Sequence, residues 1–403
     1  MRLLYLVDLS LSNFYPLLTE VFGKRLQERG HEVIWVTRPE GDEGYHETTI
    51  HGQQAYVLPH SEYSEVRSFV KYLTHRTHTS RIFDIFEKHQ PIDCVQVRND
   101  LSMALAASAL QQRTGCHFVH RITHLKAETM WYMARYGQST HPARDYLKAW
   151  SGRRLRDYLA NRADLVLPIS EAMETELSTN ITTTPMEPLP TGVDTELDRS
   201  DTDPQLFRDR FDIGDREIIL YIGSMSPSRN LEFLLEVIQQ LDMDGRVLVM
   251  VGGRDSEHRN RLRSISRKMG IADSVLFTGW LEDRKMVYNA NAAAAVGVNP
   301  LPTNNILRTS APIKVLEYLL FETPVVVSDA PDQRRVVEDS NGGFVVPYSV
   351  GTFAEALSKF FDLTPSERST MGASGRAYVK CERGFDTLTE QLLRIYSEYG
   401  LLE

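Results

Sequence analysis

The chain has 403 residues, of which 42% are hydrophobic and 25% are charged, and its formal net charge is −9. This length suffices for two domains that each bury a core, and the composition is typical of a soluble globular protein. The acidic balance excludes a general nucleic-acid-binding protein, and no apolar run reaches the roughly 18 residues of a transmembrane helix.

The first half of the chain alternates apolar, strand-like runs with helical runs. We predict helices at 14–29, which Gly30 would end, and at 100–113. The predicted strands of this half lie at 2–7, 33–37, 93–97, 117–120 and 164–168. The first strand begins next to Met1, so we expect a strand and not a signal peptide at the N-terminus. The alternation is typical of a parallel sheet with helices on both faces.

The second half repeats this alternation after a polar stretch, Pro190 to Pro204, that we interpret as a linker. We therefore predict an α/β protein with two Rossmann-like domains, at 1–200 and 201–380, and a C-terminal helical segment at 381–403. Ligands of open parallel sheets bind beyond the carboxyl ends of the strands, so we expect the site in a cleft between the domains. The predicted strands of this half lie at 217–222, 246–251, 275–277, 294–298, 324–327 and 344–346, and the predicted helices at 230–241, 256–269 and 386–399.

The strand at 117–120 leads into the polar segment Val119–His124, which we expect at the carboxyl end of that strand. Its histidines and arginine are suited to bind hydroxyls or phosphates, and an ordinary polar surface loop is the alternative interpretation. Glu128, which follows on the C-terminal side, could orient His120 or contact an acceptor. Two earlier loops contain further polar groups, with Ser10, Ser12 and Asn13 as possible donors and Asn99 and Asp100 as possible helix caps.

The region 133–162 is basic and aromatic, with seven Lys and Arg residues, two Asp residues and interleaved Tyr and Trp residues. One hypothesis is peripheral contact with an anionic membrane that carries a lipid-linked acceptor. A solvated helix face is the alternative. The three cysteines, Cys94, Cys116 and Cys381, have neither paired nor metal-ligand spacing, so we expect a reducing, cytoplasmic compartment.

Glycines follow three predicted strands of the second half. Gly223 permits a tight exit from the strand at 217–222, and Arg229 at the next helix start could hold phosphate oxygens. Gly253 either lets the backbone approach a ligand or only turns the chain, and the turn is the simpler interpretation. Gly279 and Trp280 follow the strand at 275–277, where Trp280 either packs a nucleobase or packs its own loop.

The segment 310–318 predicts a loop followed by the start of a helix. The small residues Ser310 and Ala311 let the backbone approach a ligand, and the free N–H groups of a helix start favour an anion such as phosphate. Lys314 adds a point charge in the first turn. Glu317 lies on the same helix face, where a carboxylate suits hydroxyls such as a ribose diol better than phosphates. A surface Lys–Glu pair is the alternative interpretation.

This segment resembles the donor-nucleotide motif of retaining glycosyltransferases of family 4, which have the GT-B fold. That motif has two glutamates separated by seven residues and is followed by a Pro-Val-Val strand. Glu317 matches the second glutamate, and Thr309 stands at the position of the first, which usually contacts the sugar. The departure resembles a sub-branch with the pattern Ser-x-Pro-x-Lys-x-x-Glu-Tyr.

Other parts of the chain resemble the same family less closely. The family pattern Gly-Arg-x-x-x-x-Lys-Gly grips the donor diphosphate; here Arg229 stands at its lysine and Ser224 at its arginine. A histidine at the end of a first-domain strand contacts the donor sugar near the anomeric carbon in the family, and His120 is the position that we match to it. The Gly279 and Trp280 loop resembles the segment that flanks the nucleobase.

The resemblance implies a retaining glycosyltransferase that uses a UDP- or GDP-sugar and a glycan, lipid-linked or small-molecule acceptor. Catalysis would depend on His120, Arg229 and Lys314, with no cofactor and no metal, because two cations would face the diphosphate. Two alternatives stay open, a nucleotide-sugar 2-epimerase and a non-catalytic homologue that binds a nucleotide or partners an active transferase. Turnover with an acceptor, epimerisation without one, or binding without turnover separates these three hypotheses.

Overall fold

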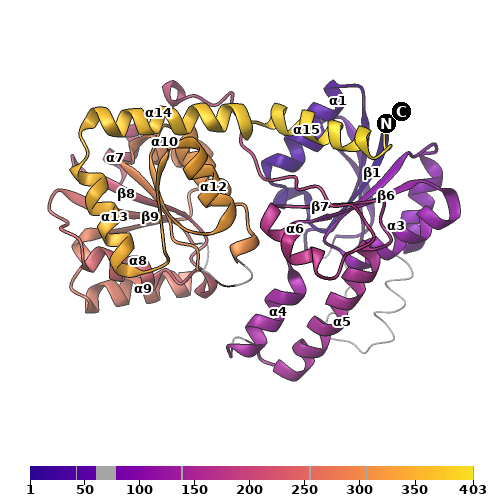
Figure 1. Cartoon of the computed structure of the whole chain (residues 1–403), viewed down its shortest axis with the longest axis horizontal. Coiled ribbons are helices and arrows are strands. Elements are labelled where there is room, and N and C mark those ends of the chain that lie inside the picture. Colours follow the sequence, from indigo (N-terminus) through magenta and orange to yellow (C-terminus); the bar gives the residue numbers. More distant parts are fainter. Residues whose placement is uncertain are drawn as a thin grey trace. The chain divides into compact units, whose positions relative to one another are not determined.

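The computed structural model describes residues 1–41, 43–59, 79–137, 139–253, 256–302, 304 and 307–402. The chain divides into two compact units: unit 1 comprises Met1–Pro190 and Phe385–Glu403, and unit 2 comprises Thr191–Gly384 (Figure 1). The division falls at the start of the predicted linker and not at residue 200. The final segment of unit 1 begins at Phe385, where the sequence predicted a segment starting at 381.

Unit 1 contains a seven-stranded sheet with the order β3-β4-β2-β1-β5-β6-β7. β3 runs antiparallel to β4, and the other neighbouring strands are parallel. The carboxyl ends of the parallel strands therefore lie along one edge. The strands are β1 (Arg2–Val7), β2 (Glu32–Thr37), β3 (His46–Ile50), β4 (Gln53–Val57), β5 (Cys94–Arg98), β6 (His117–Ile122) and β7 (Leu165–Pro168).

Helices bury both faces of this sheet, as the near-continuous apolar strands predict. Leu4 and Leu6 of β1 point into a core with α3, whereas Leu3 and Tyr5 point into a second core with the first helical segment and α15. The predicted helix at 14–29 is formed in two successive pieces, η2 and α1, of which η2 is a π-helix, and η1 precedes it in the chain. The helices are η1 (Leu11–Asn13), η2 (Leu18–Arg25), α1 (Leu26–Glu28), α3 (Leu101–Thr114), α4 (Lys126–Arg135), α5 (Pro142–Ala160), α6 (Glu171–Ser178) and α15 (Phe385–Glu398).

Unit 2 contains a six-stranded, fully parallel sheet with the order β10-β9-β8-β11-β12-β13. The order in which strands are added reverses between β8 and β11, and open parallel sheets bind ligands at the carboxyl ends of the strands at such a reversal. The strands are β8 (Glu217–Gly223), β9 (Arg246–Gly252), β10 (Val275–Gly279), β11 (Val296–Asn299), β12 (Val325–Ser328) and β13 (Gly343–Val346).

The helices of unit 2 also cover both faces of their sheet. Ile219 and Tyr221 of β8 lie in the core that α8 and α13 cover, and Ile218 and Leu220 lie in the core that α10 and α11 cover. The α/β prediction of two parallel-sheet domains is confirmed. The helical segments are η3 (Arg199–Asp201), α7 (Pro204–Arg210), η4 (Pro227–Arg229), α8 (Glu232–Gln239), α9 (Ser256–Lys268), η5 (Ala272–Ser274), α10 (Arg284–Ala293), η6 (Leu307–Thr309), α11 (Ile313–Leu320), α12 (Pro331–Ser340), α13 (Val350–Asp362) and α14 (Pro365–Glu382).

Candidate functional site

Lys314 lies at the carboxyl edge of the unit 2 sheet, in the first turn of α11. Its Nζ atom is 4.1 Å from the ring centroid of Tyr221 in β8. A Cβ atom on Gly223 would lie only 2.6 Å from that Nζ atom. Glycine at 223 is therefore needed for more than a tight strand exit, because any side chain there would displace Lys314.

Three hydrogen bonds fix the segment that carries Lys314. The Tyr318 hydroxyl accepts a hydrogen bond from the Ile222 N–H at 2.8 Å, which ties α11 to the end of β8. The Thr191 hydroxyl donates to the Ala311 carbonyl at 3.1 Å, and the Ser310 hydroxyl donates to the Leu307 carbonyl at 2.5 Å. The predicted loop and helix start are thus held rigidly beside β8.

The charges around Lys314 are unbalanced. Burial lowers the pKa of Lys314 well below its ordinary value, and the nearby Arg229 guanidinium lowers it further, while Glu317 opposes both. Burial raises the pKa of Glu317, against the effects of Arg284 and Lys314. Within the part of the chain that the structure describes, neither Lys314 nor Arg229 forms an ion pair. An anionic ligand beside these two groups would offset the cost of burial and favour the charged form of Lys314.

Arg284 is a member of this site that sequence reasoning missed. Its Nη2 atom lies 3.8 Å from Glu317 Oε1, and its side chain is 57% exposed. No motif marks Arg284, because it stands at the start of α10 and reaches Glu317 only through the fold. Its contact leaves the other carboxylate oxygen of Glu317 able to accept a hydrogen bond.

The two remaining predicted glycines lie beside each other at the ends of β9 and β10. The Arg259 Nη1 atom donates to the Gly253 carbonyl at 2.9 Å, and a Cβ atom on Gly279 would lie 3.2 Å from the same Nη1. Trp280, the next residue, is 51% exposed, so its ring does not fill the core. Arg259 thus lies between Gly253, which it binds, and the loop that presents Trp280.

The two substituted motif positions have distinct surroundings. Ser224 is exposed, and its carbonyl accepts a hydrogen bond from the Tyr221 hydroxyl at 3.0 Å. Thr309 is only 2% exposed, at the end of η6. Thr309 therefore occupies a buried position in the turn before Lys314.

A second polar cluster lies at the carboxyl edge of the unit 1 sheet. Asp8, directly after β1, pairs with Arg98 at the end of β5 and with Lys126 at the start of α4. Ser10, Ser12 and Asn13 in the following loop bond to one another, with the Asn13 Nδ2 atom 2.6 Å from Ser10 Oγ and the Ser10 and Ser12 hydroxyls 3.3 Å apart.

Asn99 holds the segment after β6 and does not cap a helix as predicted. Its Oδ1 atom accepts hydrogen bonds from the N–H groups of Thr123 at 2.8 Å and His124 at 3.3 Å. Its Nδ2 atom donates to the Thr123 hydroxyl at 2.8 Å. Asp100 is the helix cap, because its side chain accepts from the N–H groups of Ser102 and Met103. Asn99 therefore fixes where His124 stands.

The position predicted for His120, the carboxyl end of a strand, is wrong. β6 continues to Ile122, so His120 lies inside the sheet with 0% exposure. Neither ring nitrogen has a hydrogen-bond partner among the described residues, and burial lowers the pKa of His120 to about 4. β6 continues through Arg121, which is also buried although it is charged, so the strand ends two residues later than predicted.

His124 is the histidine that stands beyond the end of β6. Its side chain is exposed, and its Nε2 atom lies 3.2 Å from the Thr129 hydroxyl. Burial of the ring on one side lowers its pKa, with further lowering by Lys126 and Arg98. Glu128, predicted to orient His120, instead binds Arg156 at 2.8 Å.

Two family models match the chain. "Glycosyltransferase Family 4" matches residues 19–197, and "Glycosyl transferases group 1" matches residues 216–362. Among solved structures, sucrose-phosphate synthase from Thermosynechococcus elongatus has a TM-score of 0.75 at 18% identity, over 99% of both chains. The chain has the GT-B fold. Each unit carries the match to one of the two glycosyltransferase models, in agreement with the resemblance. Anabaena Alr3699/HepE in complex with UDP has a TM-score of 0.71 at 15% identity, over 99% of this chain and 100% of that one.

Two curated relatives match part of the chain. The alpha-D-kanosaminyltransferase of Streptomyces kanamyceticus is 25% identical over 52% of this chain and 51% of its own. A GDP-mannose-dependent monoacylated alpha-(1-6)-phosphatidylinositol monomannoside mannosyltransferase of Corynebacterium glutamicum is 26% identical over 52% of this chain and 55% of its own. The chain thus matches about half the length of these relatives.

The described residues contain neither a metal-binding cluster nor a membrane-spanning helix. No group of three or more His, Cys, Asp or Glu side chains in them is placed to hold a metal ion. Likewise, no helix among these residues combines the length and apolar character needed to cross a membrane.

Proposed function

We propose that the chain is a retaining glycosyltransferase that moves a sugar from a UDP- or GDP-sugar to a hydroxyl of a glycan, lipid-linked or small-molecule acceptor. The observation that carries the proposal is the arrangement of Lys314, Arg229 and Glu317 at the carboxyl edge of the unit 2 sheet. Two cations without an ion-pair partner among the described residues suit a diphosphate. A partly buried carboxylate on the same helix suits a ribose diol.

The same arrangement supports a mechanism by electrostatic stabilisation. When the bond between the sugar and the diphosphate breaks, negative charge grows on the diphosphate, and the preorganised Lys314 and Arg229 would stabilise it without a metal. The helix start at Ile313 adds backbone N–H groups. We assign the histidine near the reacting carbon to His124 in place of His120, because His124 stands at the end of its strand and is exposed.

The comparisons favour this donor class and leave its base open. UDP is bound in the Anabaena structure, and the Corynebacterium relative is named as dependent on GDP-mannose with a phosphatidylinositol-based acceptor. Retention of configuration follows from the resemblance of the Lys314 and Glu317 segment to the family 4 motif.

Thermal-shift titration with UDP, GDP, ADP and their sugars tests the proposal. One nucleotide should raise the melting temperature, since a ligand at 100 times its Kd stabilises the folded state by about 2.7 kcal/mol. Glu317→Ala should lose most of that shift, whereas Glu236→Ala, an exposed glutamate on α8, should keep it. No shift with any nucleotide would contradict the proposal, and epimerisation of the sugar without an acceptor would assign the site to an epimerase.

Substitutions of the two histidines should have different effects on turnover in a transfer assay. His124→Ala should lower turnover by roughly ten-fold, the loss of one or two hydrogen bonds, while nucleotide binding persists. His120→Phe should leave turnover unchanged. It should also stabilise the protein in acid: the pKa of His120 falls from 6.5 to about 4 on folding, so the unfolded chain takes up a proton in that window and the folded chain does not. Loss of transfer in folded His120→Phe would restore His120 to the site.

A further inference from the structure

The hairpin of α4 and α5 exposes most of the large apolar side chains on the surface of the described chain. The two helices run side by side in unit 1 (Figure 1). Large hydrophobic side chains exposed outside this hairpin are Tyr45, Leu105, Leu206 and Trp280. Those within it are Trp131, Met133, Tyr136, Leu147, Trp150 and Tyr158, and they are 42–66% exposed.

The same hairpin is positively charged within an acidic protein. Residues 126–162 contain eight Lys and Arg residues and three Asp and Glu residues, a net charge of +5, whereas the whole chain carries −9. A local charge opposite in sign to that of the chain points to an anionic partner.

Internal ion pairs occupy the acidic residues of the hairpin. Arg156, which is buried, lies 2.8 Å from Glu128 on α4 and 2.8 Å from Asp157, so these three side chains fasten α4 to α5. The third carboxylate, Asp145, accepts a hydrogen bond from Ser139 and pairs with Arg144. The negative charges are therefore neutralised inside the hairpin.

Several cations on the exposed surface of the hairpin take no part in these ion pairs. Arg135, Lys148, Arg154 and Arg162 are exposed and form no ion pair with the described residues. Arg154 lies over the Trp150 ring and Arg162 over the Tyr158 ring, at 5.7 and 5.4 Å from the centroids. Each of these two guanidinium groups thus lies beside an exposed aromatic ring. At a membrane surface, the guanidinium group could contact a lipid phosphate while the ring lies at the boundary between headgroups and acyl chains.

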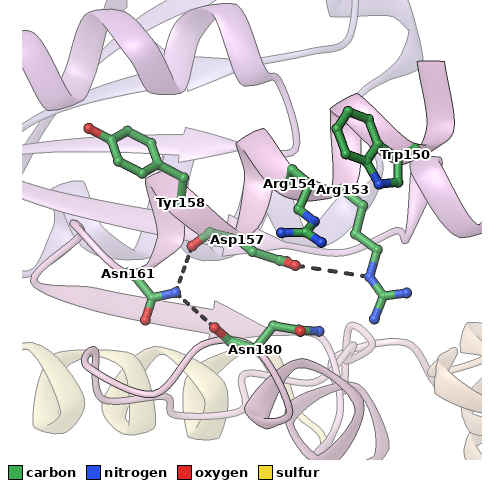
Figure 2. Close-up of a pocket in the computed structure, with 7 residues that line it drawn as sticks. All are labelled: Trp150, Arg153, Arg154, Asp157, Tyr158, Asn161 and Asn180. Atoms are coloured by element: carbon green, nitrogen blue, oxygen red, sulfur yellow. Dashed lines mark hydrogen bonds and ion pairs between the residues drawn. The ribbon is translucent and has the colours of Figure 1, made fainter. Parts of the chain in front are cut away.

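A pocket of about 500 Å³ opens on α5 beside these pairs (Figure 2). Arg153 and Arg154 line it from the helix. Asn161 donates to the carbonyls of Asp157 at 2.8 Å and Asn180 at 2.9 Å, which fixes the floor of the pocket (Figure 2). Arg153 pairs with Asp157 at 4.0 Å, whereas Arg154 forms no ion pair with the described residues, so the Arg154 guanidinium is the group suited to a phosphate-bearing headgroup (Figure 2).

We propose that the α4–α5 hairpin binds the surface of an anionic phospholipid membrane. Trp131, Trp150 and Tyr158 would lie at the level of the headgroups, Leu147 would enter the acyl boundary, and the outer cations would face the lipid phosphates. The exposed Leu147 and Met133 favour lipid over a nucleic acid, which would use the aromatic rings and cations alone. This inference does not depend on the proposed transfer reaction.

Vesicle flotation tests the proposal with the full chain. The protein should float with phosphatidylcholine vesicles that contain phosphatidylglycerol, and not with phosphatidylcholine alone. Binding should fall at about 1 M NaCl, where the screening length is roughly 3 Å. Lys148→Glu with Arg154→Glu should lower the partition coefficient by at least about ten-fold. The matched control, Arg267→Glu with Lys268→Glu at the exposed end of α9, should bind as the wild type does.

Three outcomes would overturn the membrane proposal. The wild-type protein could fail to float with the anionic vesicles, or the two double variants could bind the vesicles equally well. In the third outcome, the protein would bind a single-stranded oligonucleotide but not the vesicles. The UDP and GDP thermal shift should persist in Lys148→Glu with Arg154→Glu. A chain that binds vesicles but no nucleotide would support the membrane surface and contradict the transferase, and the reverse result would do the opposite.

Discussion

Replacing Lys314 by methionine should weaken binding of the donor nucleotide by about 100-fold. A hydrogen bond to a charged group contributes roughly 1.5–3 kcal/mol, and the substitution removes both the bond and the charge while keeping a similar volume. The same variant should melt at a higher temperature than the wild type without ligand, because burial disfavours the charged form of Lys314 and methionine carries no charge. Calorimetric titration and a thermal melt measure the two effects.

The pH dependence of stability and of nucleotide affinity provides a second test of Lys314. The pKa of Lys314 is lowered in the folded state, so the unfolded chain binds the extra proton as pH falls from 10.5, and stability without ligand should rise with pH in that window. A bound diphosphate favours the protonated amine, so nucleotide affinity should fall as pH rises through the same window. Lys268→Met, an exposed lysine on α9, is the control. An unchanged Kd in Lys314→Met would remove Lys314 from the diphosphate site.

Gly252→Ala should destabilise unit 2 by about 3–4 kcal/mol. Gly252 has φ +115°, which disfavours every other residue, and its Cβ would lie 2.3 Å from the Gly223 carbonyl oxygen on the paired strand. Because that contact is with backbone, β8 would have to move, and the position of Gly223 under Lys314 would move with it. Urea unfolding followed by circular dichroism measures the loss.

Gly270→Ala separates the cost of backbone strain from the cost of a steric clash. Gly270 also has positive φ, +74°, but nothing lies within 4 Å of its Cβ position. It should therefore show only the backbone cost, about 1–2 kcal/mol. Equal losses of stability in the two variants would mean that β8 moves to accommodate the alanine side chain at position 252. That result would disprove the tight fit of the two strands.

The alternation of strands and helices was readable because buried parallel strands are apolar throughout. It failed where that rule does not hold: β3 is polar and exposed, with the sequence HETTI, β4 begins with two glutamines, with the sequence QQAYV, and neither strand was predicted. The end of β6 was misplaced for a related reason: the predicted strand stopped at His120 because the polar Arg121 was interpreted as a loop residue, although it is buried within the sheet. Polar residues inside a strand give no local signal of burial.

The site was predictable only where its residues are close in sequence. Lys314 and Glu317 share one helix, so spacing alone placed them on one face. Arg284 reaches Glu317 from another helix, and Arg259 lies beside Gly279 at the end of β10, and the fold alone creates these two proximities. His124 had a usable signal, since it follows the last apolar residues of its strand. The roles of the predicted site residues stay predictions.

Tyr318 links three elements whose sequences lie far apart. A Cβ atom on Gly297 of β11 would lie 2.4 Å from its ring, and its hydroxyl holds the end of β8 through Ile222. Grafting α11 alone from a chain with a smaller residue at this position would leave a hole beside Gly297 and an unpaired N–H on β8. Exchanging donor preference between such proteins therefore requires β8, β11 and α11 to be transplanted together, as one cassette.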